Sequence, residues 1–119
     1  MSASQRRKGA AFERRIVLDL KLAGYPEAKR NLDQYQESSG RDITIDAPIC
    51  LQLKTGKKPS WRQALREAIA SAAIGEYAVA VTHDDHGQTV AHIPWEDFLE
   101  LLALSDVRHA LQPRRDPAI

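Results

Sequence analysis

Residues 40–58, GRDITIDAPICLQLKTGKK, decide the fold of this 119-residue chain. Apolar and polar residues alternate over 43–46 and again over 49–54, on either side of a turn at Pro48. Alternation with a period of two is typical of a strand, and two such segments joined by a short turn predict an antiparallel hairpin. A basic loop is expected over 55–59.

Upstream of this hairpin, the spacing predicts a helix over 9–23. Phe12, Ile16 and Leu20 recur on one helical face, and Gly24 is a suitable stop. A short extended piece is expected over 28–32. The polar segment 33–40 ends in Ser-Ser-Gly and predicts a mobile loop.

Downstream of the hairpin, Ser60 is expected to cap a second helix, with Gln63 in the capping-box position and Gly75 as the stop. Residues 77–82, YAVAVT, are apolar on both faces and predict a central, covered strand. A turn over 84–87 and a strand over 88–93 follow. Pro94 begins a last helix whose apolar stripe is Trp95, Phe98, Leu99 and Leu102.

The expected order is therefore α-β-β-β-α-β-β-α, which predicts an α/β fold with a mixed β-sheet flanked by helices. One domain is expected over residues 1–104, followed by a loosely ordered tail over 105–119. The single cysteine, Cys50, excludes an internal disulfide and a Cys-based zinc cage. Neither a membrane-length apolar run nor a signal-peptide core is present, so we expect a cytoplasmic protein with no membrane partner.

Charge is divided unevenly along the chain. Residues 1–62 hold 13 of the 17 Lys and Arg but 7 of the 16 Asp and Glu, whereas residues 63–119 hold 4 and 9. A basic half favours a surface that binds a polyanion, because phosphates are held largely by Lys and Arg. A solvated charged surface explains the same distribution about equally well.

Four polar side chains occupy positions that core-building does not require. Glu13 borders the apolar stripe of the first helix, Asp42 begins a strand, and Gln52 and Lys54 share one strand face. Each also has a simpler explanation. Glu13 could be a partner for Arg14 or Arg15 or a snorkelling surface acid. Asp42 could be a turn cap, and Gln52 and Lys54 could form the wet face of an edge strand.

Together these four residues predict a metal site. The hairpin brings Asp42 beside Gln52, and Glu13 approaches from the neighbouring helix. Carboxylate and carbonyl oxygens are the ligands that Mg²⁺ prefers, and a lysine nearby can polarise water or hold developing negative charge. Such a site suits metal-assisted phosphodiester hydrolysis.

Three segments resemble the archaeal-type Holliday junction resolvases, which belong to the PD-(D/E)XK, restriction-endonuclease-like nuclease superfamily. They are 7–23 (RKGAAFERRIVLDLKLA), the turn Gly-Arg-Asp-Ile at 40–43, and 49–58 (ICLQLKTGKK). The resemblance covers roughly residues 6–102. It implies a restriction-endonuclease-like fold and a homodimeric hydrolase of DNA recombination and repair that cuts four-way junctions with Mg²⁺, for which Mn²⁺ can substitute.

The resemblance also implies roles for individual residues. Glu13, Asp42 and Gln52 correspond to the metal-binding positions, with the backbone carbonyl of Leu53 as a further ligand. Lys54 corresponds to the catalytic lysine, and Ser39 (or Ser38) to a loop serine near the scissile phosphate. The residues expected to hold DNA phosphates are Arg6, Arg7, Lys8, Arg14, Arg30, Lys57, Lys58 and Arg62.

Two departures from the family pattern affect the expected activity. Arg41 replaces the proline before the metal-binding aspartate, and this change is tolerated because the position only shapes the turn. Gln52 replaces an acid, which removes one negative charge and should weaken metal affinity. The alternatives are therefore another branched-DNA or end-processing nuclease, a non-catalytic DNA-binding module with a degenerate site, and a protein-interaction domain whose basic half is incidental.

The sequence contains two weaker patterns. His83 and His86 lie in the expected 84–87 turn region, where turn polarity explains them better than metal binding, and His92 is expected to face outward. A second apolar stripe on the first helix predicts either a dimer surface or a helix packed on two sides; it comprises Ala11, Leu18 and Leu22.

Overall fold

The hairpin expected around Pro48 is present. In the computed structural model, which describes residues 3–31 and 41–105, β2 (Ile43–Thr44) pairs antiparallel with β3 (Ile49–Gly56). Ile43 lies opposite Leu51 in this pair. The strand β1 (Lys29–Arg30) adds antiparallel to the free edge of β2, so three strands form a meander.

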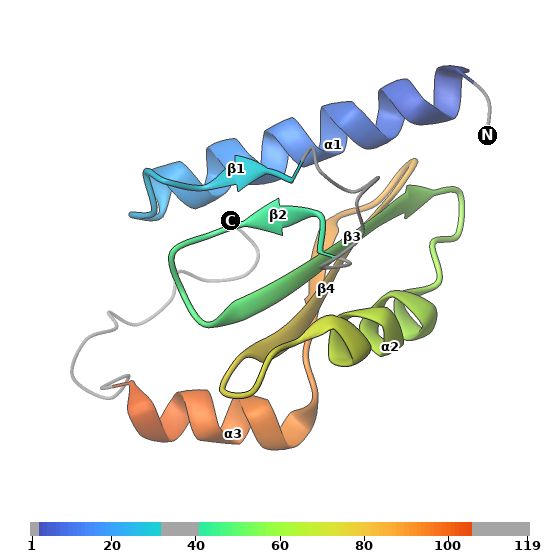
Figure 1. Cartoon of the computed structure of the whole chain (residues 1–119). Coiled ribbons are helices and arrows are strands. Elements are labelled where there is room, and N and C mark those ends of the chain that lie inside the picture. The colour runs from blue at the N-terminus through green and yellow to red at the C-terminus, as the bar shows by residue number, and fades with distance from the viewer. Residues whose placement is uncertain (1–2, 32–40, 106–119) are drawn as a thin grey trace, which may run out of the picture.

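A crossover through α2 (Trp61–Ser71) joins β3 to β4 (Tyr77–Asp84), which runs parallel to it from the Ile49–Tyr77 pair to the Gly56–Asp84 pair. The strand β5 (Thr89–His92) closes the order β1-β2-β3-β4-β5, antiparallel to β4. The sheet is therefore mixed and β4 is internal, as the sequence predicts. The element order α-β-β-β-α-β-β-α is also confirmed (Figure 1).

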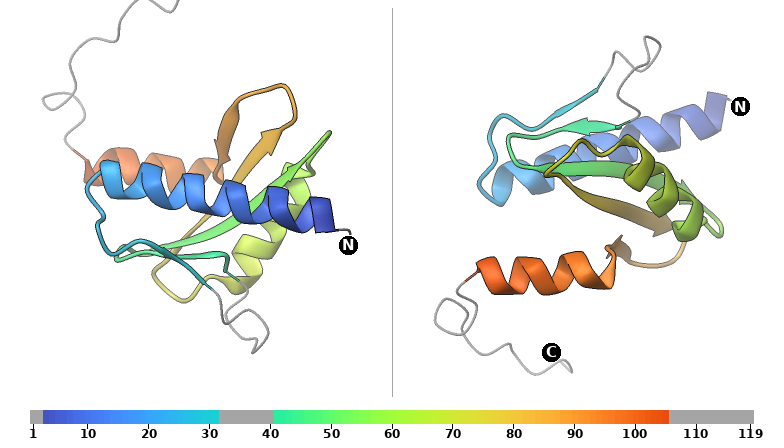
Figure 2. Two further views of the ribbon diagram at one scale, coloured as in Figure 1. Left: turned by 90° about the horizontal axis from the view of Figure 1, so that it is seen from above. Right: turned by 60° about the horizontal axis from the view of Figure 1, so that its bottom comes forward.

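The helix α1 (Ala3–Leu22) covers one face of the sheet (Figure 2). Its buried side chains, Phe12 and Ile16, pack with Ile43, Leu51 and Val81 to form the main apolar core. Burying a large apolar side chain stabilises the folded state by about 1.5–3 kcal/mol. This cluster therefore holds α1 against both the β1–β3 meander and β4.

Small side chains form the opposite face, against which α2 packs (Figure 1). Ala64 and Ala68 of α2 and Ala80 of β4 are fully buried, and Cys50 lies beside them on β3. Because alanine allows the backbones to approach closely, this layer is thin. The larger side chains of the core lie on the α1 side.

The helix α3 (Trp95–Leu104) carries the predicted apolar stripe. None of its residues is buried in the described chain. Its exposed large side chains include Trp95, Phe98, Leu99 and Leu102. Periodicity identifies an amphipathic helix but does not determine which surface covers it, since the covering surface is set by tertiary contacts.

Element boundaries show three further differences and one agreement. The helix α2 ends at Ser71, with Ala72 as its C-cap, rather than at the expected stop, Gly75. The first helix begins at Ala3 rather than residue 9, because polar residues 3–8 can extend a helix without adding to its apolar stripe. The strand β3 runs to Gly56, into the expected 55–59 loop, because pairing with β4 continues that far. The predicted cap is present: the Gln63 N–H donates to Ser60 Oγ at 3.2 Å.

No helix among the described residues is long and apolar enough to cross a membrane. The expected 33–40 loop and the tail beyond residue 105 lie outside the described residues.

Candidate functional site

Asp42 lies at the start of β2 and is fixed by β3 through both backbone and side chain. Its N–H donates to the carbonyl of Leu51 at 3.1 Å, and its Oδ2 accepts from the backbone N–H of Leu53 at 2.8 Å. The Asp42 side chain therefore adds one hydrogen bond between the two strands of the hairpin. The turn-cap reading of Asp42 misses this cross-strand bond.

Burial raises the pKa of the Asp42 carboxyl above its ordinary value of 3.8. The Leu53 N–H and the positive charge of Lys54 oppose this rise in pKa, whereas the negative charges of Glu13 and Glu67 add to it. Asp42 thus experiences acidic groups from both helices: Glu13 belongs to α1 and Glu67 to α2. A cation at this position would relieve the repulsion among these carboxylates.

Gln52 and Lys54 lie on β3 opposite Ala80 and Thr82 of β4. Alternation along the strand places both on the face covered by α2, because their neighbours Leu51 and Leu53 belong to the α1-side core. Gln52 is only 8% exposed, and Lys54 is half-buried. The edge-strand explanation for these polar residues is therefore wrong, since β3 is internal and α2 covers its polar face.

Glu13 projects from α1 beside the buried Phe12 and accepts a hydrogen bond from Arg30 Nε at 2.8 Å. Both side chains are partly buried. The simpler reading, a partner for Arg14 or Arg15, is wrong, because the partner comes from β1. Arg30, expected to hold a DNA phosphate, is thus engaged with Glu13 in this structure.

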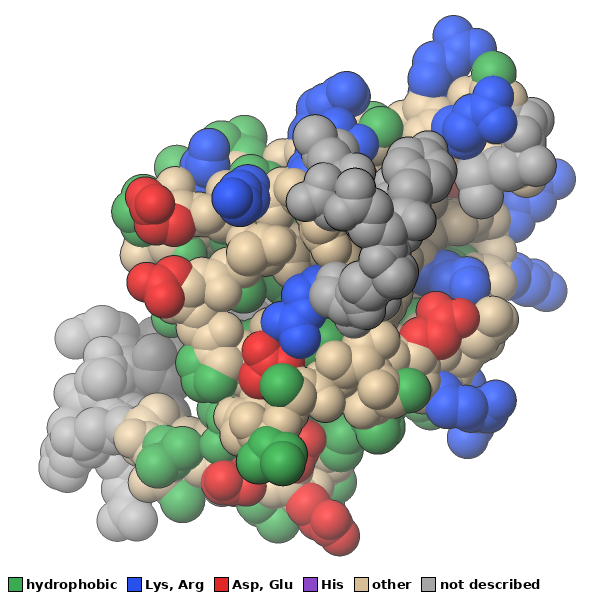
Figure 3. All heavy atoms as spheres, in the orientation of Figure 1, with side chains coloured by type: hydrophobic (Ala, Val, Ile, Leu, Met, Phe, Trp, Pro, Cys, Tyr) green, Lys and Arg blue, Asp and Glu red, His purple; other side chains and the backbone are tan. Residues whose placement is uncertain are grey.

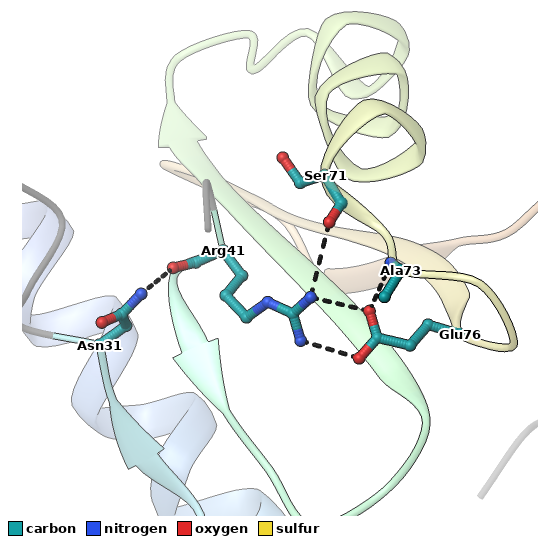
Figure 4. A network of polar contacts seen from close by, with 5 residues as sticks. All are labelled: Asn31, Arg41, Ser71, Ala73 and Glu76. Atoms are coloured by element: carbon teal, nitrogen blue, oxygen red, sulfur yellow. Dashed lines mark hydrogen bonds and ion pairs between the residues drawn. The ribbon is translucent and has the colours of Figure 1, made fainter. Parts of the chain in front are cut away.

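Arg41 ties the start of β2 to the α2–β4 connection (Figure 4). Its two terminal nitrogens donate to the Glu76 carboxylate at 2.7 and 2.9 Å, and one of them reaches the carbonyl of Ser71 at 3.5 Å. Glu76 also accepts from the backbone N–H of Ala73 at 2.8 Å. These bonds lower the pKa of Glu76, with the Arg41 bond as the largest cause. Arg41 therefore has a structural contact that the sequence does not reveal.

The exposed basic residues gather mainly along α1 and at the β3–α2 connection, whereas acidic side chains are prominent around α3 (Figure 3). Lys8 forms an ion pair with Asp85 at 3.2 Å. Arg62 lies over the ring of Trp61, 4.6 Å from its centroid. The exposed residues expected to hold phosphates are Arg6, Arg7, Lys8, Arg14, Lys57, Lys58 and Arg62.

His83 and His92 have structural partners. His92 does not simply face outward: it hydrogen-bonds Thr82 Oγ1 at 2.8 Å and stacks on Trp61, with ring centroids 5.4 Å apart. Burial lowers the pKa of His92. His83 Nδ1 lies 3.0 Å from Thr89 Oγ1, and the His83 ring contacts Phe12. These contacts favour the structural explanation over metal binding.

Among residues 3–31 and 41–105, no three His, Cys, Asp or Glu side chains converge as a metal-binding group. The structure brings Asp42 and β3 together and leaves Glu13 with Arg30. Ser38 and Ser39 lie outside the described residues. Glu67, which no sequence pattern singles out, acts electrostatically on Asp42 from α2 and adds to the rise in its pKa.

A shallow depression lies away from these residues, between α1 and the ends of β3 and β4. Lys8, Arg15 and Asp85 contribute to its lining, whereas Asp42, Gln52 and Lys54 do not. The candidate site at the hairpin and α2 is therefore separate from this depression.

Comparison with protein-family models finds no match, and comparisons with curated proteins and with solved structures also find none.

Proposed function

We propose that this protein is a metal-dependent, structure-selective DNA endonuclease of the PD-(D/E)XK type, most similar to a Holliday junction resolvase. The observation that carries the proposal is the anchoring of Asp42 against β3 by the Leu53 N–H, beside the strand that bears Gln52 and Lys54. The order of helices and strands and the mixed sheet support it. The motif resemblance supplies the substrate class.

The residues present have the chemistry to hold a divalent cation. Asp42 uses one carboxylate oxygen for the Leu53 N–H, and Gln52 makes no hydrogen bond through its amide within the described part of the chain. Glu13 and the Leu53 carbonyl complete the proposed Mg²⁺ or Mn²⁺ ligands. When bound, the cation would neutralise charge on the scissile phosphate.

Lys54 has a distinct role in this proposal. It lies two residues from Gln52 on the same face of β3 and forms no ion pair within the described residues, although its charge acts on Asp42. An ammonium group so placed can orient the attacking water or stabilise charge that develops on the phosphate. Ser39 lies outside the described residues, and its role near the scissile phosphate is proposed from the motif resemblance alone.

DNA binding is proposed through the exposed basic residues of α1 and of the β3–α2 connection. Phosphate contacts of this kind carry no base sequence, so recognition should follow DNA shape. A homodimer is proposed through the outer stripe of α1, where Leu18 and Leu22 are 55% and 79% exposed. Within the described residues the buried side chains of α1 are Phe12 and Ile16, which lie on the other stripe, and this exposure of the outer stripe supports the proposed dimer surface.

The decisive experiment is cleavage of a labelled four-way DNA junction, beside linear duplex of matched sequence, with Mg²⁺ or Mn²⁺. Wild type is compared with Asp42→Ala and with Asp46→Ala, an exposed aspartate in the β2–β3 turn. We expect paired nicks from wild type and Asp46→Ala and none from Asp42→Ala. Cutting of flaps or duplex alone would replace the junction by another branched or end-processing substrate.

The neutral Gln52 favours one further candidate, a non-catalytic DNA-binding module. This module predicts junction binding without cutting, and no calorimetric Mn²⁺ binding that depends on Asp42. Absence of any salt-sensitive DNA binding would contradict both functions and favour a protein-interaction domain.

A further inference from the structure

Gln52 is an unusual residue for the interior of this sheet. It is 92% buried on an internal strand, and its amide makes no hydrogen bond within residues 3–31 and 41–105. Buried polar groups in folded proteins are nearly always hydrogen-bonded. Its amide atoms make no described hydrogen bond and yet are not among the fully enclosed side-chain atoms, so they retain some contact with solvent. The Gln52 amide is therefore available to a ligand that arrives from solvent.

Glu67 lies on the helix that covers the same sheet face as Gln52. It follows Ala64 by three residues and precedes Ala68 by one, and both alanines are fully buried. Residues three and four apart share a helix face, so Glu67 borders the stripe that packs on β3 and β4. Its Oε1 accepts a hydrogen bond from Gln63 Nε2 at 3.2 Å, which leaves Oε2 without a described partner.

Two observations connect Glu67 to Asp42. The hairpin register places Asp42 next to Ile43, opposite the Leu51–Gln52 part of β3, so Asp42 and Gln52 are neighbours across two strands. The negative charge of Glu67 adds to the rise in the pKa of Asp42, so Glu67 acts on Asp42 from its exposed position on α2. Glu13, the other nearby acid, is held by Arg30 at 2.8 Å.

We infer that Glu67 supplies the acidic ligand that position 52 lacks, so that the carboxylates of Asp42 and Glu67 and the amide oxygen of Gln52 bind one divalent cation. The inference builds on the metal site of the proposed function and changes its ligand set. Hard cations such as Mg²⁺ and Mn²⁺ are held by carboxylate and amide oxygens, and each carboxylate adds charge that offsets the cation's lost hydration. A neutral Gln52 is then compatible with a functional site, because α2 provides the missing charge.

The test measures Mn²⁺ binding to the metal-free full-length chain by calorimetry, without DNA. We expect Glu67→Gln to weaken Mn²⁺ binding at least 10-fold, while Glu96→Gln, an exposed glutamate of α3, leaves it unchanged. Circular dichroism of the metal-free variants checks that each is folded. In the Glu67→Gln background, Gln52→Glu should restore binding, because it returns one carboxylate to the same site.

The rescue separates a ligand from a residue that merely supports α2, since a structural defect would not be repaired by a charge on β3. Unchanged Mn²⁺ binding in Glu67→Gln, with binding lost in Asp42→Ala, overturns the inference and leaves the nuclease proposal intact. Glu67-dependent Mn²⁺ binding without cleavage of any DNA supports the inference and overturns the proposed activity. Absence of Mn²⁺ binding to wild type at millimolar concentration overturns the inference directly.

Discussion

The Arg41–Glu76 pair should be a main support of the strand that carries Asp42. The contact is bidentate, with N–O distances of 2.7 and 2.9 Å, and the two side chains are 21% and 18% exposed. Truncating one partner of a fully buried pair costs about 3–5 kcal/mol, and an exposed pair contributes up to about 1 kcal/mol. Because each side chain still reaches water, we expect Arg41→Ala to lower the free energy of unfolding by about 2–3 kcal/mol.

Urea denaturation followed by circular dichroism measures this loss, with Arg66→Ala as the control. Arg66 is exposed on α2 and forms no described ion pair, so its removal should change stability by less than about 0.5 kcal/mol. Arg41→Lys keeps the charge but cannot form the bidentate contact with Glu76, so it should recover only part of the stability that Arg41→Ala loses. A double-mutant cycle with Glu76→Gln should give a coupling of about 1–2 kcal/mol.

The same pair predicts a pH dependence whose sign follows from Glu76. Its folded-state pKa lies below the ordinary 4.5, chiefly because of the Arg41 bond, so the stabilisation is present above pH 4.5 and is lost as the pH falls through the folded pKa. The difference between wild type and Arg41→Ala should therefore shrink in acid. A coupling below about 0.5 kcal/mol at neutral pH would refute the reasoning.

Three further results are expected. Asp42→Asn should stabilise the metal-free protein at neutral pH, because the raised pKa of Asp42 means that the fold disfavours its charged form. In urea denaturation this gain in stability should vanish below pH 3.8, and the control Asp46→Asn should show no gain. Leu18→Asp should convert a dimer to a monomer in size-exclusion chromatography with light scattering, and a wild-type monomer would contradict the proposed interface. Lys57→Ala with Lys58→Ala should weaken junction binding and reduce the slope of log affinity against log salt by about 2, while an unchanged slope would exclude phosphate contacts at these lysines.

The sequence predicts the framework of this fold well where local signals are strong. Alternation around Pro48 identifies the hairpin, and the Ser60 cap is found as a hydrogen bond to Gln63. These features depend on residues close together in the chain. Contacts between distant segments are not predictable in this way: nothing local to Arg41 indicates Glu76, and nothing local to Glu13 selects Arg30 over nearby arginines.

The candidate site shows the same division. The shared face of Gln52 and Lys54 follows from strand geometry, but the burial of Gln52 depends on α2 lying over it. Glu67 reads as a solvated helix charge in the sequence. The one available sequence signal is that Glu67 lies at the edge of the apolar stripe containing Ala64 and Ala68. Glu13 lies at the same kind of position in the first helix.

The parallel β3–β4 ladder has a kinetic consequence. It joins residues far apart in the chain, such as Ile49 and Tyr77, whereas β2 is only two residues long. The chain must close a long loop through α2 before this ladder forms, and contacts of high sequence separation slow folding. Asp42 directly precedes this short strand, and its side chain depends on β3 for its anchor. Its surroundings should therefore become ordered late in folding, and native-state hydrogen exchange should find the backbone N–H of Leu53 less protected than that of Val81 at the centre of β4.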